Sequence, residues 1–320
     1  MIKKVLPVAI AVCVISFSSC KPKNNFKTKN GFEYMIVKDE KGKTASPGDI
    51  LKMNITIRDV TYDKNGKATR DSLLISSRAQ NHGEPVEMQL QPSGNKGDWM
   101  SCLTLFSAGD SGIFRISVDT LRKSLPANQP LPPYLVPGSM VVYEVSMVSV
   151  KSLDDYKKEK EAKSAEQLKT DDKALQDYFT KNNLHPEKTA SGLYYTITKE
   201  GSGNPAQKGQ SVSVNYTGKV LDGVTFDSNL DTNFHHKEPF TLTLGQRQVI
   251  PGWDEGLALL KKGSKATLYI PSTLAYGPQS PSPKIGPNSI LVFDVEILDI
   301  KDAAKSDKNN TSANLIKQKK

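Results

Sequence analysis

The sequence predicts an α+β protein in which one fold, an antiparallel sheet curled around a short helix, occurs twice with a helical segment between the copies. Its 320 residues give room for two domains and their linkers. In the second half of the chain, segments with the period of β-strands surround a single helical segment. Similar motifs recur in the same order in the first half, and the segment between the halves is rich in helix-forming residues.

Residues 1–20 resemble a bacterial lipoprotein signal peptide. Two lysines precede an apolar run over residues 5–17, which is shorter than the about 20 residues that a membrane-spanning helix needs. Small residues then precede Cys20, which predicts lipidation of Cys20 as the first residue of the mature protein. The chain is therefore expected to be exported and anchored to a bacterial membrane, facing the periplasm or in the outer membrane. Phe17 stands where that motif usually has leucine, so an ordinary signal peptide is the alternative.

Positive charge is concentrated near the two ends of the mature chain. The net charge is +9, and the excess lies in residues 21–30, an expected flexible tether, and in residues 301–320, an expected disordered basic tail. Residues 31–300 carry nearly balanced charge, which disfavours nucleic-acid binding through a basic groove. A lysine-bearing tether suits the anionic surface of a membrane.

The usual patterns of nucleophilic catalysis and metal binding are missing from the sequence. His235 and His236 are adjacent rather than spaced as helical metal ligands, and we interpret them as part of a solvated loop. Cys102 lies among apolar residues and is expected to be a small buried hydrophobe without a catalytic role. We therefore expect neither a metal nor a cofactor.

Residues 31–150 repeat the order of motifs found in the second half. The first copy begins with GFEYMIVKDE and the second with GLYYTITKEG. Residues 98–117 align without gaps on residues 252–271, and residues 136–150 answer the last predicted strand. One fold used twice is the economical interpretation.

Residues 151–186 are expected to form a helical linker. The segment has no glycine, its first proline is Pro186, and apolar residues recur at helical spacing near its end, at Leu175, Tyr178 and Phe179. Asp171 and Asp172 suit a helix start, so the segment is one helix or a pair of helices. It would serve as a spacer or as the contact of a homodimer.

Residues 187–300 are expected to contain five strands and one helix. The strands are predicted from alternation and apolar runs at 193–199, 211–220, 240–244, 265–271 and 290–299. The helix is predicted over 252–262. It has acidic residues in its first turn, Lys261 and Lys262 in its last, and Gly263 to end it, as the helix dipole and glycine capping favour.

Aromatic residues recur through this second copy, at Tyr216, Phe226, Phe240, Trp253, Tyr276 and Phe293. A single carboxylate, Asp227, directly follows one of them. The motifs VNYTGKVLDGVTFDS, VIPGWDEGL, LAYG and LVFDVEIL, in this order, resemble an FKBP-type peptidyl-prolyl cis–trans isomerase domain over residues 187–300. The resemblance implies two FKBP-like domains and an enzyme that acts on proline-containing polypeptides without a cofactor.

The resemblance also implies roles for the site residues. Trp253 would form the floor under the proline ring, and the walls would come from Tyr216, Phe226, Phe240, Val249, Ile250 and Phe293, with Ile285 at the family's spacing. The backbone N–H of Ile250 and the hydroxyl of Tyr276 would bind substrate carbonyls. Asp227 would either hydrogen-bond to Tyr216 and orient the pocket or interact with the twisting carbonyl. The loop after Asp227 is longer than in compact relatives and lacks the arginine often found there, so Asp227 lacks an evident charge partner.

The first copy is expected to be a degenerate, non-catalytic domain. In the sequence alignment Ile55, Arg70, Val86 and Arg122 replace Tyr216, Phe226, Phe240 and Tyr276, whereas Asp71, Trp99 and Tyr143 answer Asp227, Trp253 and Phe293. Two arginines directed into a proline pocket would deny it an apolar lining.

Two functions fit these features. The first is a membrane-anchored prolyl isomerase that assists the folding of exported proteins. The second is a non-catalytic, chaperone-like lipoprotein that uses both copies as interaction domains.

Overall fold

The computed structural model describes residues 26–302 except 82, 94–96, 125–129 and 222. The predicted signal peptide, the lipidation site at Cys20 and almost all of the predicted tail lie outside the described residues. The described chain forms two compact units that divide between Lys158 and Glu159. Each unit is described by itself.

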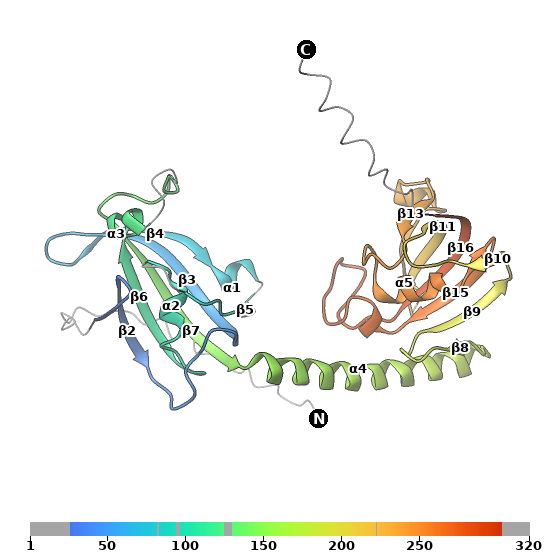
Figure 1. The fold of residues 1–320 in the computed structure, drawn as a ribbon, viewed down its shortest axis with the longest axis horizontal. Coiled ribbons are helices and arrows are strands. Elements are labelled where there is room, and N and C mark those ends of the chain that lie inside the picture. Colours follow the sequence, from blue (N-terminus) through green and yellow to red (C-terminus); the bar gives the residue numbers. More distant parts are fainter. Residues whose placement is uncertain (1–25, 82, 94–96, 125–129, 222, 303–320) are drawn as a thin grey trace, which may run out of the picture. The chain divides into compact units, whose positions relative to one another are not determined.

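In its described residues, the first unit is a curved antiparallel sheet with three short helices, α1 to α3 (Figure 1). Its strands run in the order β1-β2-β6-β7-β3-β4, and β5 also pairs with β3. The strands are β1 (Lys27–Lys29), β2 (Phe32–Lys38), β3 (Ile50–Tyr62), β4 (Ala68–Ser76), β5 (Val86–Gln89), β6 (Ser111–Ser117) and β7 (Met140–Lys151). The helices are α1 (Ser77–Gln80), α2 (Met100–Leu103) and α3 (Val118–Ser124).

The start of the first unit differs from the expected tether over residues 21–30. Lys27–Lys29 form β1, which pairs with β2 from Lys27 opposite Tyr34 to Lys29 opposite Phe32. Strand pairing satisfies the backbone of this lysine-rich segment, although its side chains are too polar for a core strand. Cys102 is fully buried, as expected, and this burial raises its pKa to about 11.

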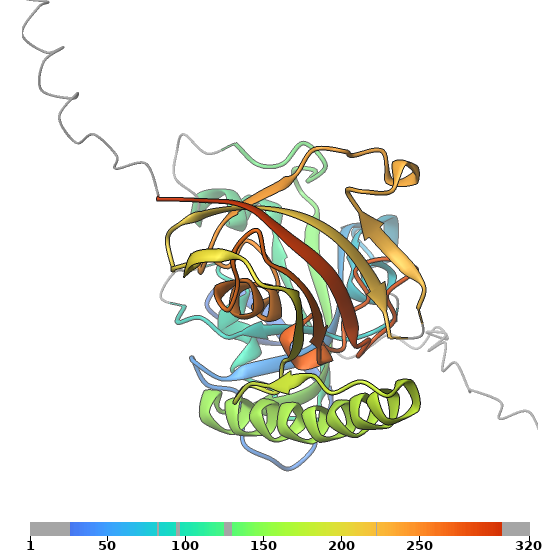
Figure 2. The same cartoon turned by 90° about the vertical axis from the view of Figure 1, so that its right-hand side faces the viewer.

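The second unit repeats the topology of the first. Its main sheet runs in the order β12-β11-β16-β15-β9-β8, with β13 also paired to β11, so each strand of this sheet occupies the position of a strand in the first sheet. The sheet curves around α5 (Pro251–Ala258), as Figure 2 shows. Its strands are β8 (Glu187–Lys188), β9 (Tyr194–Lys199), β11 (Ser211–Val220), β12 (Thr225–Ser228), β13 (Phe240–Thr243), β15 (Lys265–Ile270) and β16 (Leu291–Lys301). The predicted α+β class and its duplication are confirmed.

Strand β11 shows why these residues form a half-buried sheet. Val212, Val214 and Tyr216 are buried and alternate with polar residues that are only partly covered. This period of two places one set of side chains on the core and the other toward solvent. The concave face of the sheet therefore carries the aromatic residues of the expected site.

The helix over 252–262 is shorter than expected. Helix α5 ends at Ala258, and Lys261–Lys262 form the short strand β14, which pairs with β10 (Ser202–Pro205). The two lysines therefore do not complete a helix terminus. Short 3₁₀ turns, η1 (Thr232–Phe234) and η2 (Ser272–Leu274), complete the unit.

A single helix, α4 (Leu153–Asn182), connects the two sheets along the chain (Figure 1). The predicted helical linker is confirmed as one helix rather than a pair, because α4 continues through Asp171 without a break. Asp171 is 2% exposed. The two oxygens of its carboxylate accept from Gln167 Nε2 at 2.7 Å and from the backbone N–H and Oγ of Ser272 at 2.7 and 2.6 Å. The carboxylate thus holds the segment η2 instead of starting a helix.

Most of α4, from Glu159 onward, belongs to the second unit, and its last third packs on the sheet of that unit. Leu175 and Phe179 of the helix form a core on the outer face of the sheet with four residues in or next to its strands: Tyr194, Tyr269, Ile290 and Val292. The ring of Phe179 meets those of Tyr194 and Tyr269 edge-on, at centroid distances of 5.0 and 4.9 Å. Aromatic pairs in this geometry stabilise a fold beyond their buried area. The described residues contain no helix that is long and apolar enough to cross a membrane.

Strand pairing aligns the two sheets residue by residue. Ile57 is paired with Tyr143 in the first sheet, and Gly218 with Phe293 at the same position of the second. Likewise, Val86 is paired with Met53, and Phe240 with Val214. On the neighbouring strand, Thr56 faces Ser76 as Thr217 faces Ser228. The residues just before these serines are Leu74–Ile75 in the first unit and Phe226–Asp227 in the second.

The expected equivalence of Arg70 and Asp71 with Phe226 and Asp227 is therefore wrong. The β3–β4 hairpin is longer than β11–β12, which displaces the true counterparts by four residues to Leu74 and Ile75. Arg70 instead pairs with Asp59, a fully buried carboxylate. Arg122 lies exposed on α3.

Candidate active site

Five of the six predicted aromatic residues gather on the concave face of the second sheet. Trp253 of α5 lies at their centre, with ring centroids 5.2 Å from Tyr216, 5.9 Å from Phe240 and 5.0 Å from Phe293. Phe226 packs edge-on against Phe293 at 5.6 Å. Trp253, Tyr216 and Phe293 are buried, whereas Phe240 is 39% exposed. The cluster thus has a buried floor and an accessible edge.

Gly218 allows these rings to reach the strand. A Cβ atom at this position would lie 2.6 Å from Phe293 Cε1 and 2.8 Å from Phe226 Cζ, which is closer than side-chain carbons approach each other. Glycine is therefore needed for close approach rather than for a special backbone angle.

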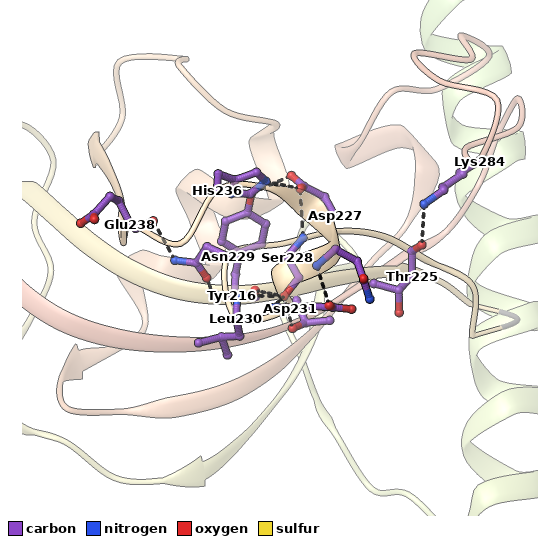
Figure 3. Close-up of polar contacts among 12 residues, drawn as sticks. Tyr216, Thr225, Asp227, Ser228, Asn229, Leu230, Asp231, His236, Glu238 and Lys284 are labelled. Carbon is purple, nitrogen blue, oxygen red and sulfur yellow. Dashed lines mark hydrogen bonds and ion pairs between the residues drawn. The ribbon is translucent and has the colours of Figure 1, made fainter.

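Asp227 is anchored within this cluster (Figure 3). One carboxylate oxygen, Oδ2, accepts from the Tyr216 hydroxyl at 2.6 Å. The other, Oδ1, accepts from the backbone N–H of Ser228 at 2.9 Å and lies 2.8 Å from His236 Nε2. Burial, and then the contact with Asp227, raise the pKa of Tyr216, which keeps its phenol protonated.

Tyr276 lies near this pair but outside the ring contacts. It follows η2, is 38% exposed, and its pKa is raised by burial and then by the charge of Asp227. Since η2 is bound to Asp171, helix α4 helps to hold the segment that carries Tyr276. The structure thus brings the phenol to the edge of the site.

The remaining predicted residues, Val249, Ile250 and Ile285, belong to the same hydrophobic core or pack against it. Ile250 precedes α5, and its carbonyl accepts from Trp253 N–H at 2.9 Å. Its own N–H has no acceptor among the described residues, so it is available to a ligand carbonyl. Val249 packs against the core and Ile285 is buried within it.

His236 is a site residue that sequence reasoning missed. The pair His235–His236 was expected in a solvated loop, yet His236 lies against Asp227 and its ring stacks near that of Tyr216, with centroids 6.3 Å apart. The sequence signal that could have indicated this contact is Asp227, a carboxylate without an evident partner, followed nine positions later by His236, whose ring can donate a hydrogen bond to it.

Asn229 explains how the loop after Asp227 is held. Its Oδ1 accepts from Tyr216 N–H at 2.8 Å, and its Nδ2 donates to the carbonyls of Val214 and Glu238 at 3.3 and 3.2 Å. One buried side chain therefore joins both ends of the loop to β11 (Figure 3).

The first unit has an apolar cavity in the corresponding region. Its volume is about 370 Å³, and it is lined by Ile57, Leu73, Leu74, Ile75, Leu121, Tyr134, Leu135, Val141 and Tyr143. Neither Arg70 nor Arg122 lines it, contrary to the expectation that arginines would occupy this region. The lining includes the counterparts of Gly218, Phe226, Asp227 and Phe293 but no carboxylate.

Comparison with known proteins adds sequence evidence to this geometry. A family model described as FKBP-type peptidyl-prolyl cis-trans isomerase matches residues 202–298. The chain is 46% identical over 148 residues to a probable FKBP-type peptidyl-prolyl cis-trans isomerase FkpA of Neisseria meningitidis serogroup B, covering 44% of this chain and 52% of that protein. It is 44% identical over 119 residues to FkpA of Escherichia coli K12, covering 37% of this chain and 42% of that protein.

A shorter relative is covered almost completely. The FK506-binding protein of Neisseria meningitidis serogroup B is 43% identical over 109 residues, which are 34% of this chain and 96% of that protein. The chain thus spans about half or less of the FkpA relatives and nearly all of the compact one.

Proposed function

The chain belongs to the FKBP-type peptidyl-prolyl cis–trans isomerase family, and we propose that its second unit isomerises the peptide bonds that precede proline in polypeptides. The observation that supports this most directly is the gathering of five rings around Trp253 beside one anchored carboxylate. Such a site offers an apolar surface and a few fixed polar groups, and no nucleophile is required.

The chemistry follows from the amide bond itself. An X–Pro bond isomerises in tens to hundreds of seconds because its partial double-bond character sets a barrier of about 18–20 kcal/mol. Resonance places negative charge on the carbonyl oxygen, which water stabilises in the planar ground state. Transfer to an apolar site removes more of this stabilisation from the planar state than from the twisted one. Each 1.36 kcal/mol of that difference is about a tenfold gain in rate.

Asp227 acts in this mechanism by orienting the site rather than by attacking the substrate. Both of its oxygens already accept hydrogen bonds from protein groups. The carboxylate fixes the phenol of Tyr216, whose ring forms one wall. The free N–H of Ile250 and the hydroxyl of Tyr276 would hold the carbonyls of the bound peptide.

The test is an isomerisation assay on the full chain with proline-containing tetrapeptides. Trp253→Leu should lower kcat/KM about 10- to 100-fold, because the floor loses its largest ring. Trp99→Leu, the matched change in the first unit, should leave kcat/KM unchanged. An inactive wild-type chain, or a Trp253→Leu variant with full activity, would contradict the proposal.

The cellular setting is proposed from the sequence. Lysines before a short apolar run and small residues before Cys20 support an exported, lipid-anchored folding catalyst at a bacterial membrane. Fatty-acid labelling that is lost in Cys20→Ser would support the anchor, and labelling that persists would contradict it. The first part of α4 is largely exposed and is the candidate contact of a homodimer. The molecular mass of the protein in solution would show whether it forms that dimer.

A second candidate function, client binding without catalysis, is favoured by the cavity of the first unit. Its occupant would be an extended polypeptide with bulky apolar side chains, the same class of ligand that the equivalent surface of the second unit takes. Leu73 is 56% exposed at its edge. Leu73→Glu should weaken the full chain's suppression of aggregation of an unfolded protein while leaving tetrapeptide isomerisation intact. Equal suppression by both chains would exclude this role.

A further inference from the structure

The loop between β12 and β13 places a histidine on the carboxylate of the site. His236 Nε2 lies 2.8 Å from Asp227 Oδ1, and the two side chains are 45% and 39% exposed. The imidazole also lies nearly parallel to the ring of Tyr216, at an interplanar angle of 26°. One side chain therefore contacts both members of the Tyr216–Asp227 pair (Figure 3).

The position of His236 is set by the backbone on both sides of it. Asp231 caps η1 by accepting from Asn233 N–H at 3.0 Å, and His235 then takes a left-handed conformation with φ of 59°. After His236, the carbonyl of Glu238 accepts from Asn229 Nδ2. The loop therefore turns the imidazole toward Asp227 instead of leaving it free in solvent.

We propose that His236 is a positioning residue of the isomerase site and makes its activity depend on pH near neutrality. This inference rests on the proposed isomerase function. Histidine is the side chain type that ordinarily changes charge between about pH 5 and pH 8. A charged imidazole donates a charge-assisted hydrogen bond to a carboxylate, which is roughly twice as strong as a neutral one. Asp227, and with it Tyr216, is then held more firmly, so catalysis is more efficient in mild acid.

The other charged groups around the pair do not account for a change in this range. Burial, and then the charge of Asp227, raise the pKa of Tyr276 further above the ordinary value of a phenol. Lys284 extends from the opposite side to the Phe234 ring and the carbonyl of Thr225. Asp231, Lys237 and Glu238 belong to the loop itself, and side chains of these types ordinarily change charge outside about pH 5.5 to 8.

The test compares the pH profiles of three full-length chains on an uncharged proline tetrapeptide. In the wild type, kcat/KM should rise about two- to fivefold from pH 8 to pH 5.5, a few tenths to one kcal/mol by the usual conversion. His236→Arg should be flat near the acid value, because its charge is fixed. His236→Gln should be flat at the lower value, because glutamine donates without charge. Coincident profiles for the wild type and His236→Gln would overturn the proposal.

His235→Asn is the matched control. His235 is exposed, and asparagine tolerates its left-handed backbone, so the wild-type profile should persist. A second readout is independent of activity: in nitrogen NMR spectra, Asp227→Asn should shift the Nε2 resonance of His236 but not that of His235. If it shifts neither, the contact does not exist. An inactive wild type that shows this shift would refute the isomerase function and leave the contact established.

Discussion

The two units share a strand order and a register but differ on the concave faces of their sheets. Where the second has Tyr216, Gly218, Phe226 and Asp227, pairing places Ile55, Ile57, Leu74 and Ile75 in the first. In the first unit Trp99 stacks on Tyr143 at 5.9 Å, whereas their counterparts Trp253 and Phe293 meet edge-on at 5.0 Å. The topology is thus preserved without the Tyr216–Asp227 pair. We infer that a few positions on adjacent strands determine which of the two units can act as an isomerase.

The units also use buried carboxylates differently. In the first, Asp59 is buried and pairs with Arg70 and Ser139, all within that unit's sheet and loops. Among the described residues of the second unit, the buried carboxylate is Asp171, which comes from α4 and binds the segment before Tyr276. The second unit therefore packs against a helix outside its repeated motif, and we expect residues 187–300 alone to be less stable than the unit with α4.

The largest expected effect comes from replacing Gly218 of the second unit with isoleucine, the residue found at the corresponding position, Ile57, of the first unit. Gly218→Ile should abolish isomerase activity, with a loss of at least about 100-fold, because the new side chain would occupy the space of Phe226 and Phe293. Tetrapeptide assays and circular dichroism would separate lost activity from lost fold. Ile57→Gly in the first unit is the control and should leave activity unchanged. Activity in a folded Gly218→Ile chain would break the comparison.

Removing the helix contact should mainly affect stability. Phe179→Ala deletes a ring that meets two tyrosines on the outer face of the sheet and should lower the free energy of unfolding of the second unit by about 3–5 kcal/mol. Urea unfolding followed by fluorescence measures this. Lys173→Ala, on the exposed side of α4, should change stability by less than about 0.5 kcal/mol. Similar midpoints for the two variants would show that α4 is only a spacer.

A somewhat smaller loss is expected from Asp171→Ala. The N–H and hydroxyl of Ser272 would be left buried without their acceptor, at a cost of about 2–3 kcal/mol. Because Tyr276 lies on the same segment, KM for tetrapeptides should rise more than kcat falls. Asp177→Ala is the control on the exposed side of the helix. An unchanged KM in Asp171→Ala would separate the helix from the site.

Restoring the carboxylate alone should not restore the chemistry. Ile75→Asp in the first unit, made together with Trp253→Leu to silence the second, should add no measurable isomerase activity. Ile55 offers no hydroxyl to the new carboxylate and Ile57 fills the position of Gly218. Recovered activity in this double variant would show that fewer positions separate the units than we infer.

The smallest effect is a pH dependence of stability at the start of the second unit. Lys188, and then Tyr194, lower the pKa of Asp172, so its carboxylate is favoured in the folded state. Its contribution is present above the unfolded pKa of about 4 and is lost as pH falls through the lower folded value. Since the pair is partly exposed, the contribution is well under about 1 kcal/mol. Urea midpoints of the wild type and Asp172→Asn should converge between about pH 5 and pH 3.

Sequence patterns predicted the sheets well because alternation reports directly which side of a strand is buried. The strand 211–220 was predicted with the bounds of β11, and the duplication follows from similar motifs in the same order. Ring positions such as Trp253 and Phe293 were predicted through motif resemblance, and the structure brings them together.

What the sequence could not predict depends on contacts between distant segments. Asp171 is a residue type that often begins a helix, and local sequence favours that role. Its actual partner, Ser272, is 101 positions away and cannot be found from local sequence. The four-residue displacement of Asp71 arises from hairpin length, which local alternation does not reveal. His236 was missed because an adjacent pair of histidines has no periodic signature, and only the fold of the loop selects one of them.

The strand order has a consequence for how the protein is made. In each unit the last strand of the chain, β7 or β16, is inserted between two strands that precede it. Neither sheet can therefore close until its whole sequence has left the ribosome. Phe179 precedes Ile290 by roughly 110 residues, about 5–20 seconds of synthesis at ordinary rates. During that interval the nascent chain exposes the apolar face of α4 to solvent. It therefore has the same need for protection from aggregation that its proposed clients have.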